Sequence, residues 1–530
     1  MAPQTCGGGG ATGLCGCTPI TACPTGKVCG SYPNGCGGTI TCGTCSSGKT
    51  CNGANACVCA PNAYLCSGAT LLRCAVDGSD YASVATCPSA SLCDASLGRC
   101  TECTPSSYYC VGADRYSCSS VGIGSKVATC INAALCASGS GASCGTPVCA
   151  TDEKTCSGST ARTCNATRTG WVDEACAIGC AAGSCIKVST LADGSGQHMC
   201  VALTNGTVRC WGATADGATG DAPLPHNKPV PVSGLTSIAQ VVIAQGRSGA
   251  RRSDGTLLWW GRVYSSTEPS GVIIKTPATI PGVTSTTSMS LGWFSACGVK
   301  TDGTIVCYGK GPLGDSTANA FDPAKANPYL TGILSVAQSS GTFGFALSGS
   351  DARGWGYDSW GVLGTGSTTD HLIPVSTFGG AIQIAPGGNH TCALILGGGV
   401  RCSGNNDYGQ LGDNTLTTNN SPVDVTGVGA AKATQICSGS IHSCARLDDS
   451  TVKCWGANNR GQLGDGTKTN RKMATAVLGL TGATKVACGY NASCALMSDG
   501  LVKCWGSNAE GELGDGTTLT ERLTPWPVAW

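Results

Sequence analysis

Pairs of cysteines recur ten residues apart in the second half of this 530-residue sequence, each pair centred on a short polar turn. The fragment "HSCARLDDSTVKCWG", residues 442–456, is one example. Cysteines at facing positions of a β-hairpin come close enough to form a disulfide. The spacing therefore predicts five hairpin disulfides: Cys200 with Cys210, Cys297 with Cys307, Cys392 with Cys402, Cys444 with Cys454, and Cys494 with Cys504.

Two further copies of the same pattern lack both cysteines. Their positions ten residues apart read Gly249 and Trp259 in one copy, and Gly344 and Gly354 in the other. Cysteines are thus present or absent together, as disulfide partners would be. Cys437 and Cys488 remain, each on the strand before the hairpin in successive copies. We predict a disulfide between these two cysteines, with two free buried thiols as the alternative.

Three histidines, His198, His390 and His442, stand thirteen residues before an aromatic-Gly pair or its equivalent. Histidines can bind metals, but a shared site would need them on neighbouring repeats, whereas they lie on the first, fifth and sixth. We expect them to have a packing role. The loops "NNDYGQLGDN" (405–414) and "NNRGQLGDG" (458–466) could suggest calcium, but they lack the closing Glu of a calcium loop. Asx turns use the same residues, so no metal site is predicted.

The sequence contains no GxSxG, HExxH or phosphate-binding loop, and only five histidines. We therefore predict no catalytic residues and no cofactor. The net charge of +1 provides no positive field for nucleic acid, and no apolar run is long enough to insert into a membrane.

The 40 cysteines indicate an oxidising compartment, because thiols at this density persist as disulfides only there. The first residues lack the apolar core of a signal peptide. We give the cysteines more weight and expect an extracellular or cell-surface location.

Twenty-eight of the cysteines lie before residue 186. After a Gly/Cys-rich segment (1–58), six cysteines recur with similar spacing in each of three predicted modules, 59–102, 103–148 and 149–186. Six cysteines allow fifteen pairings, and the spacing does not choose among them. Such small units need disulfides because they bury little apolar surface.

Residues 187–530 contain a repeat of 47 to 52 residues, marked seven times by an aromatic-Gly pair or its remnant. Short strands and turns at this period predict the blades of a β-propeller, and hence an all-β chain. The landmarks are Trp211-Gly212, Trp260-Gly261, Tyr308-Gly309, Trp355-Gly356, Ser403-Gly404, Trp455-Gly456 and Trp505-Gly506.

The segments "CWGANNRGQLGDGT" (454–467), "CWGSNAEGELGDGT" (504–517) and "SGNNDYGQLGDNT" (403–415) resemble the regulator of chromosome condensation repeat family. The resemblance implies a seven-bladed β-propeller. We expect its last segment, "TPWPVAW" (524–530), to pair with the strand near Val188 and close the ring. The preceding modules resemble cysteine-rich repeats of secreted bacterial surface proteins.

Blades 2 to 4 lose the repeat consensus and contain all five phenylalanines. We expect Phe343 and Phe345 to fill the core, since they alternate on one strand. Aromatic and Arg side chains in loops are typical of interface hot spots. The predicted partner-binding residues are Tyr264, Arg262, Phe321, Tyr329, Tyr357 and Trp360.

Together these features predict a secreted or surface-displayed bacterial binding or adhesion protein without enzymatic activity. Its propeller loops would bind a protein or glycan on a surface, and the cysteine-rich stalk would act as a spacer. One alternative is a self-assembling subunit of an extracellular fibre or sheath, or another homo-oligomer. Another is a secreted enzyme inhibitor or a lyase-like propeller.

Overall fold

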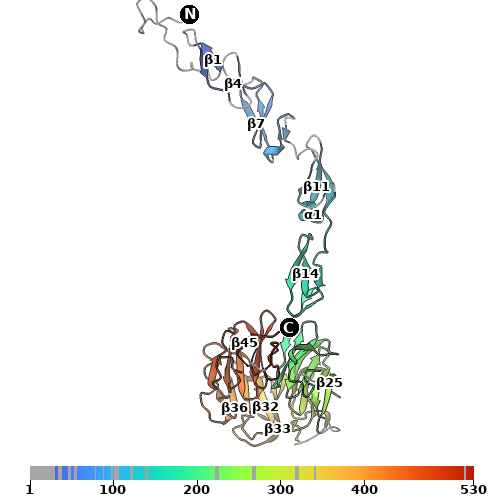
Figure 1. Ribbon diagram of the computed structural model, residues 1–530, viewed down its shortest axis with the longest axis vertical. Coiled ribbons are helices and arrows are strands. Elements are labelled where there is room, and N and C mark those ends of the chain that lie inside the picture. The colour runs from blue at the N-terminus through green and yellow to red at the C-terminus, as the bar shows by residue number, and fades with distance from the viewer. Residues whose placement is uncertain are drawn as a thin grey trace, which may run out of the picture. The chain divides into compact units, whose positions relative to one another are not determined.

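The computed structural model describes the chain from residue 30 to residue 530, except for the following positions: 34–38, 46–48, 53–56, 78, 88, 97–98, 101–106, 120–122, 138–139, 141–142, 221–225, 265–269, 317–321, 340–341 and 519–520. Within these residues the chain is almost entirely β (Figure 1). They include no helix with the length and hydrophobicity that a bilayer crossing requires.

Seven four-stranded antiparallel sheets follow one another along residues 188–527, and each is one blade. Blades 1 and 2 are β18 (Val188–Leu191), β19 (His198–Leu203), β20 (Val208–Gly212), β21 (His226–Pro231) and β22 (Ile238–Ala244), β23 (Arg247–Arg252), β24 (Leu257–Val263), β25 (Val272–Thr279). Blades 3 and 4 are β26 (Thr286–Leu291), β27 (Ser295–Lys300), β28 (Ile305–Gly309), β29 (Asp322–Ala326) and β30 (Ser335–Gln338), β31 (Phe343–Ser348), β32 (Asp351–Gly356), β33 (His371–Ser376). Blades 5 and 6 are β34 (Ala381–Pro386), β35 (His390–Ile395), β36 (Val400–Gly404), β37 (Asn419–Asp424) and β38 (Ala433–Ser438), β39 (His442–Leu447), β40 (Val452–Gly456), β41 (Arg471–Ala476). Blade 7 is β42 (Ala483–Cys488), β43 (Ala492–Met497), β44 (Val502–Gly506) and β45 (Arg522–Pro527).

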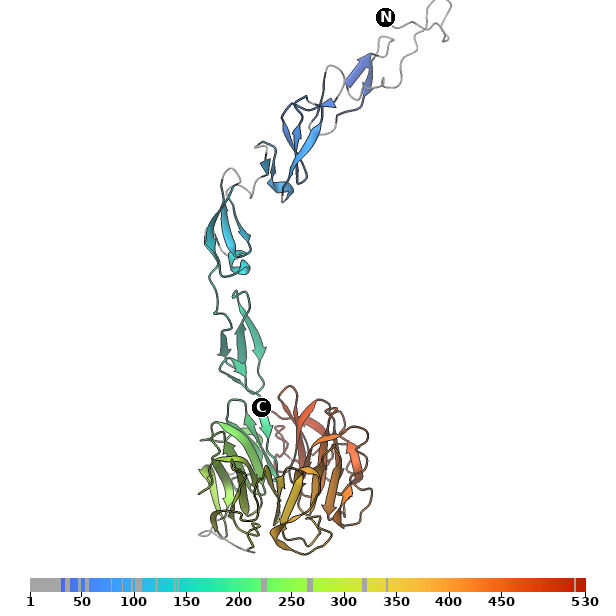
Figure 2. The ribbon, with the colours of Figure 1, turned by 180° about the vertical axis from the view of Figure 1, so that it is seen from behind.

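The first strands of successive blades pack against one another, and β42 of blade 7 packs against β18 of blade 1. Figure 2 shows the last part of the propeller (red) beside its first part (green). The ring is therefore closed. Our expectation about the closing strand is wrong, because β45 pairs with β44 in its own blade and β18 pairs with β19. Contacts between complete blades close the ring instead: Val188 N donates to Gly500 O (3.2 Å), and Trp211 Nε1 donates to Glu512 O (2.8 Å).

All twelve cysteines of the propeller are in disulfides. The sixth of these bonds joins Cys437 to Cys488 and so connects the first strands of blades 6 and 7, as predicted. The other five confirm the predicted hairpin pairs, which lie in blades 1, 3, 5, 6 and 7: Cys200 with Cys210, Cys297 with Cys307, Cys392 with Cys402, Cys444 with Cys454, and Cys494 with Cys504. Closing a loop of this length stabilises a fold by roughly 3 kcal/mol on the chain-entropy model.

An aromatic ring opposite a glycine replaces the disulfide in the two remaining blades. In blade 2, Trp259 faces Gly249. In blade 4 the residue that faces Gly354 is Phe345, not Gly344, because the hairpin turn is one residue shorter than in the other blades. A Cβ atom on Gly354 would lie 2.8 Å from Phe345 Cε1, so the ring occupies the space over the glycine. The fully buried Phe345 thus fills the core, as expected.

Indole N–H groups connect several blades to the next one. Trp455 is fully buried and its Nε1 donates to Gln410 O of blade 5 (3.0 Å). Trp260 and Trp505 make the equivalent bonds to Ala218 O (2.7 Å) and Gln462 O (3.0 Å). Each acceptor lies in the long loop between the third and fourth strands of the preceding blade. The aromatic-Gly landmark therefore holds neighbouring blades together.

The three repeat histidines also connect blades. Each is buried, and its Nε2 hydrogen-bonds with the hydroxyl of a serine on the next blade. The pairs are His198 with Ser248 (2.7 Å), His390 with Ser443 (2.7 Å) and His442 with Ser493 (2.9 Å). Burial lowers the pKa of His198 and His442 to about 4 and of His390 to about 3, so all three are neutral at pH 7.

Glycines next to these histidines make room for the imidazole rings. A Cβ atom on Gly387 would lie 2.5 Å from His390 Cε1 and 2.7 Å from Gly439 O, closer than any real Cβ contact. The spacing of Gly and His in the repeat thus reflects a close approach of two blades.

The N-terminal part consists of small sheets. Its elements are β1 (Gly30–Pro33), β2 (Thr39–Cys42), β3 (Thr50–Cys51), β4 (Cys57–Val58), β5 (Tyr64–Ser67), β6 (Thr70–Cys74), β7 (Tyr81–Thr86), η1 (Ala90–Leu92), β8 (Cys93–Asp94), β9 (Arg99–Cys100), β10 (Tyr108–Val111), β11 (Asp114–Cys118), β12 (Gly124–Thr129), α1 (Ala133–Ala137), β13 (Lys154–Ser157), β14 (Thr160–Cys164), β15 (Trp171–Ala175), β16 (Cys180–Ala181) and β17 (Ser184–Cys185). Each predicted six-cysteine module contains one three-stranded sheet.

The described disulfides of the modules follow one pairing out of the fifteen that the spacing allows. The third module joins its first cysteine to the third, its second to the fifth and its fourth to the sixth. The first module has the first two of these bonds, and the second module has the last two.

The chain divides into two compact units, Met1–Lys154 with Arg162–Asp173 and Thr155–Ala161 with Glu174–Trp530. The module boundaries at 58, 102, 148 and 186 stay predictions.

Candidate functional site

The propeller has two faces with different loops. Because the four strands of a blade alternate in direction, the loops after the first and third strands lie at one end, which we call the loop face. The hairpin turns and the connections between blades lie at the other end, which we call the turn face. Binding residues are frequently found on loops that a rigid scaffold positions, so the two faces are the first places to look for a site.

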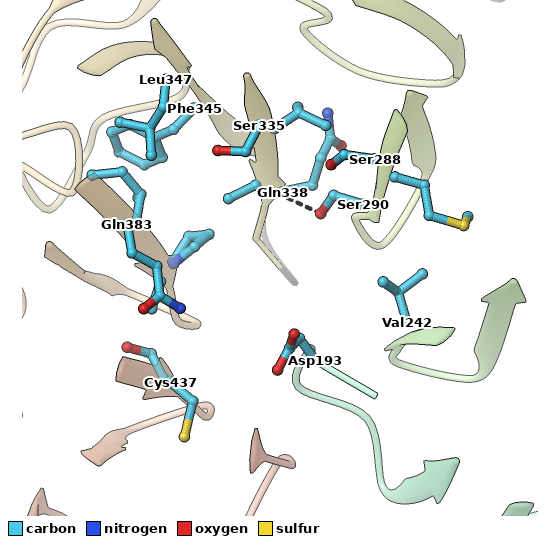
Figure 3. Close-up of a pocket in the computed structure, with 18 of the residues that line it drawn as sticks. Asp193, Val242, Ser288, Ser290, Ser335, Gln338, Phe345, Leu347, Gln383 and Cys437 are labelled. Carbon is cyan, nitrogen blue, oxygen red and sulfur yellow. Dashed lines mark hydrogen bonds between the residues drawn. The ribbon is translucent and has the colours of Figure 1, made fainter. Parts of the chain in front are cut away.

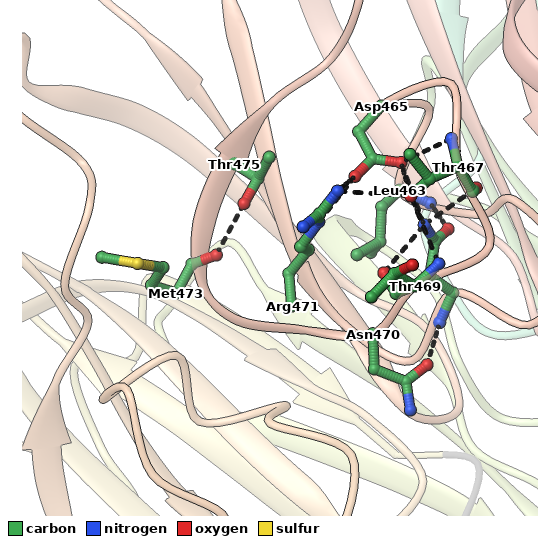
Figure 4. Close-up of polar contacts among 9 residues, drawn as sticks. Leu463, Asp465, Thr467, Thr469, Asn470, Arg471, Met473 and Thr475 are labelled. Atoms are coloured by element: carbon green, nitrogen blue, oxygen red, sulfur yellow. Dashed lines mark hydrogen bonds and ion pairs between the residues drawn. The ribbon is translucent and has the colours of Figure 1, made fainter.

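The long third-to-fourth-strand loops of blades 5 to 7 are closed by their own hydrogen bonds. Figure 4 shows the blade 6 loop, where Arg471 Nε donates to Asp465 Oδ2 (2.7 Å). In blade 6, Asn458 Nδ2 donates to Asp465 Oδ1 (3.0 Å), Thr467 O (3.0 Å) and Thr469 O (3.1 Å). Burial favours a higher pKa for Asp465, but hydrogen bonds from Thr467 and Arg471 hold it below the ordinary value. The Asn and Asp residues that could have suggested calcium therefore bond to the loop itself in these blades.

Blades 2 and 3 place three aromatic rings together on the loop face. Tyr264, at the start of the long loop of blade 2, packs edge-on against Phe294 with ring centroids 4.9 Å apart. Trp293 stacks on the same Phe294 at 5.2 Å and is 39% exposed. Tyr264 itself is buried, which corrects the expectation that its ring is free for a partner. Trp293, absent from the predicted partner-binding residues, is the exposed member of this blade 2–3 cluster.

Arg262 is engaged within the propeller. Its Nε and Nη2 atoms donate to Asp216 Oδ1 at 2.9 and 2.6 Å, and Asp216 belongs to the long loop of blade 1. These hydrogen bonds, together with the carboxylate charge, raise the pKa of Arg262. The guanidinium thus connects two adjacent loops of the loop face.

Tyr357 and Trp360 lie in the long loop of blade 4, on the loop face, and are 36% and 43% exposed. We call them the blade 4 pair. Tyr329 is 47% exposed but lies between β29 and β30, on the turn face. It therefore cannot share a contact surface with the blade 4 pair. Phe321 lies outside the described residues.

Comparison with known proteins agrees with the repeated blades of a β-propeller. Residues 354–394, 398–446 and 450–496 match a family model described as the Regulator of chromosome condensation (RCC1) repeat. A second model with the same description matches residues 381–410, 433–462 and 483–512. The chain carries RCC1 repeats. The matches run from the third strand of blade 4 into blade 7.

Curated relatives share this region at low identity. The E3 ubiquitin-protein ligase HERC2 of Mus musculus is 27% identical over 295 residues, which are 53% of this chain and 5% of that protein. The ultraviolet-B receptor UVR8 of Arabidopsis thaliana is 26% identical over 304 residues, which are 52% of this chain and 67% of that protein. The chain thus spans only a small part of HERC2.

Solved structures show the same fold. Prp20p from Saccharomyces cerevisiae, described with its binding properties to Gsp1p and histones, superposes with a TM-score of 0.54 at 17% identity. The match covers 65% of this chain and 87% of Prp20p. Human WBSCR16 superposes with a TM-score of 0.52 at 19% identity, over 61% of this chain and 93% of that one.

A cavity of about 240 Å³ lies between the first strands of the RCC1-type blades (Figure 3). Its wall includes Ser288, Ser290, Gln338, Gln383, Val242 and Phe345. Asp193 supplies the one carboxylate among the described lining residues, and Lys485 Nζ lies 3.2 Å from its Oδ2. The described wall brings no histidine together with a carboxylate, the combination that acid–base catalysis would use.

The first strands of the blades form the inner ring of the propeller, and glutamine side chains join some of them to the next blade. Gln383 Nε2 donates to Ile436 O (2.9 Å), and Ile436 N donates to Gln383 Oε1 (3.0 Å). Gln435 makes the same pair of bonds with Val486 of blade 7. These polar groups have partners in the next blade, so the inner ring is a structural element. The exposed aromatic residues of the loop face are the better candidate for binding.

Proposed function

We propose that the protein is a non-enzymatic binding protein that is secreted or displayed on a bacterial cell surface. Its loop face over blades 2 to 4 binds a protein partner, and the cysteine-rich modules act as a spacer. The observation that carries this proposal is the placement of exposed Trp293, Tyr357 and Trp360 on one face of two adjacent blades, 3 and 4.

Physical reasons support binding by these residues. Large aromatic side chains that are partly exposed release water when a partner covers them, and they dominate the energetics of many interfaces. The closed ring holds the blades that carry these loops in place, so little conformational entropy is lost on association. The description of Prp20p as a protein that binds Gsp1p and histones supports protein as the class of partner.

The binding proposal predicts a specific loss of affinity in the double variant Tyr357→Ala/Trp360→Ala. The full chain is immobilised and incubated with medium and envelope proteins of the producing cells, and the retained partner is purified. We expect at least about tenfold weaker binding by the double variant in surface plasmon resonance, because two hot-spot side chains are lost.

The matched control is Tyr408→Ala, which removes a ring of similar exposure (44%) from the long loop of blade 5 on the same face. Its affinity should change less than about twofold. Equal affinity of the double variant and the wild type would show that binding lies elsewhere. A rise of scattering with concentration in the absence of a partner would favour the self-assembling alternative.

The extracellular location predicts that the cysteines are oxidised in the native source. Cells are quenched with an alkylating reagent, and the protein is isolated, unfolded without reduction and analysed by mass spectrometry. We expect the twelve propeller cysteines to be unlabelled, because an oxidising compartment preserves their disulfides. Labelling of most of them would place the protein in a reducing compartment and remove the basis for the proposed location.

A further inference from the structure

The long loop of blade 4 has the same backbone hydrogen bonds as that of blade 6, but an aspartate replaces the central asparagine. Asp358 N donates to Asp370 Oδ1 (2.8 Å), just as Asn458 N donates to Asn470 Oδ1 (2.8 Å). Leu363 N donates to Asp358 Oδ1 at 2.9 Å, and the corresponding bond to Asn458 Oδ1 in blade 6 is 3.0 Å. One carboxylate oxygen of Asp358 therefore takes the place of the amide oxygen, and its Oδ2 takes the place of the amide nitrogen.

That second position is surrounded by oxygen atoms in every blade where the asparagine is present. The Asn458 amide donates to a carboxylate and two carbonyl oxygens, and Asn508 Nδ2 donates to Asp515 Oδ1 (3.1 Å) and Thr517 O (3.3 Å). The corresponding residues of the blade 4 loop are Thr365, Ser367 and Thr369. An ionised carboxylate has no hydrogen to donate to such oxygens. In blade 4 the place of the partly positive amide N–H group is therefore taken by a negatively charged oxygen.

Asp358 is fully buried, and its Oδ2 has no hydrogen-bond partner among the residues that the structure describes. Burial raises the pKa of the Asp358 carboxyl to about 6. The hydrogen bond from Leu363 N, the Coulomb interaction with His371 and a hydrogen bond with the Thr365 side chain act the other way and lower this pKa. Asp370 adds a second carboxylate nearby and raises the pKa of Asp358 further. A buried, unpaired carboxylate is costly unless a cation or a proton neutralises it.

We propose that the blade 4 loop binds a calcium ion, with Asp358 Oδ2 as its buried anionic ligand. Oxygen atoms of the loop at Thr365, Ser367 and Thr369, together with water, complete the coordination. Calcium fits this set because it takes carboxylate, carbonyl and hydroxyl oxygens in a flexible arrangement, whereas magnesium requires near-ideal octahedral geometry. Thr369 and Asp370 are exposed, so the ion has access from solvent.

The proposed site lies in the loop that carries the blade 4 pair, Tyr357 and Trp360. A bound ion would hold that loop in one conformation. The site itself does not depend on the proposed binding function, and its test needs no partner.

The test measures calcium binding by the full chain. Protein freed of metal with a chelator is titrated with CaCl2 in a calorimeter at pH 7.5, and its thermal midpoint is recorded with CaCl2 and with MgCl2. We expect binding of Ca²⁺ and a higher midpoint with Ca²⁺ than with Mg²⁺. Asp358→Asn should bind Ca²⁺ at least about tenfold more weakly, because the site loses its buried charge.

The variants are chosen so that folding is not in question. Asp358→Asn introduces the residue that blades 5 to 7 already use at this position, so it should fold and have a calcium-independent midpoint. Asp370→Asn keeps an oxygen acceptor for Asp358 N, as Asn470 does, and should weaken binding less. Asp407→Asn, in the blade 5 loop, is the control for a general loss of negative charge and should leave binding unchanged.

Two outcomes would overturn the proposal. In one, Asp358→Asn binds Ca²⁺ as tightly as the wild type. In the other, the wild type shows no calcium response, and lowering the pH from 7 to 5 reduces its midpoint less than it reduces the midpoint of Asp358→Asn. That result would mean that a proton, not a metal, occupies the position and lets Asp358 donate as asparagine does.

Discussion

Trp455→Ala is expected to destabilise the propeller by about 3–5 kcal/mol, the cost of emptying a large buried aromatic site. Trp455 is fully buried between blades 5 and 6, within a hydrophobic cluster that includes Val400, Leu411 and Ile436. Its indole also donates to Gln410 O (3.0 Å), so the variant leaves a buried carbonyl without this donor. The measurement is the free energy of unfolding in urea with the disulfides intact.

A pair of phenylalanine variants separates the hydrogen bond from the volume. Trp455→Phe removes the N–H group that Gln410 O accepts. Trp355→Phe removes an equally buried indole whose Nε1 has no hydrogen-bond partner in the described part of the chain. We expect Trp455→Phe to cost about 1 kcal/mol more than Trp355→Phe. Equal losses in the two variants, or a loss below about 1.5 kcal/mol for Trp455→Ala, would contradict the role of the indoles in connecting blades.

Lowering the pH from 7.5 to 5 is expected to remove about 6 kcal/mol of stability through the three buried histidines. Burial depresses the folded-state pKa of each to about 4 or about 3, against about 6.5 when unfolded. Below pH 6.5 the unfolded chain therefore takes up protons that the native state does not. Stability falls as pH decreases until the folded-state values are reached.

Protonation of Asp358 in calcium-free buffer has the opposite effect on stability to that of the histidines. The Asp358 pKa is raised to about 6, so the native state takes up a proton in this range and regains about 1 kcal/mol. Each single His→Gln variant, in which glutamine can still bond to the serine, should reduce the slope of unfolding free energy against pH by about 1.2 kcal/mol per unit between pH 6 and 5. A stability that does not change from pH 7.5 to 5 would show that the imidazoles are accessible to protons in the native state.

Features set by short sequence distances were predictable from the sequence. Facing cysteines ten residues apart, such as Cys444 and Cys454, report the register of a hairpin directly. The aromatic-Gly landmark counted the blades, because each repeat forms one four-stranded sheet. The disulfide between Cys437 and Cys488 followed from the place of each cysteine on the strand before the hairpin in adjacent repeats.

Features that depend on one missing residue or one distant neighbour were not predictable. Gly344 and Gly354 were aligned by their spacing, but a shorter turn in blade 4 places Phe345 opposite Gly354. Tyr329 looked equivalent to Tyr357 in the sequence, yet the alternation of strand direction puts them on opposite faces. Tyr264 was predicted at the surface, and packing against Phe294 of the next blade buries it.

The sequence by itself determined the all-β repeat, the hairpin disulfides and the regions where the consensus decays, since all of these are local or periodic. Only the tertiary structure decided how the ring closes, which of fifteen pairings the modules use, and that each repeat histidine meets a serine about fifty residues away. It also showed that Asp358 is a buried carboxylate at a position where blades 5 to 7 have asparagine. The physical reason is that such contacts join separate blades or loops, and their partners are set by three-dimensional packing that spacing along the chain does not encode.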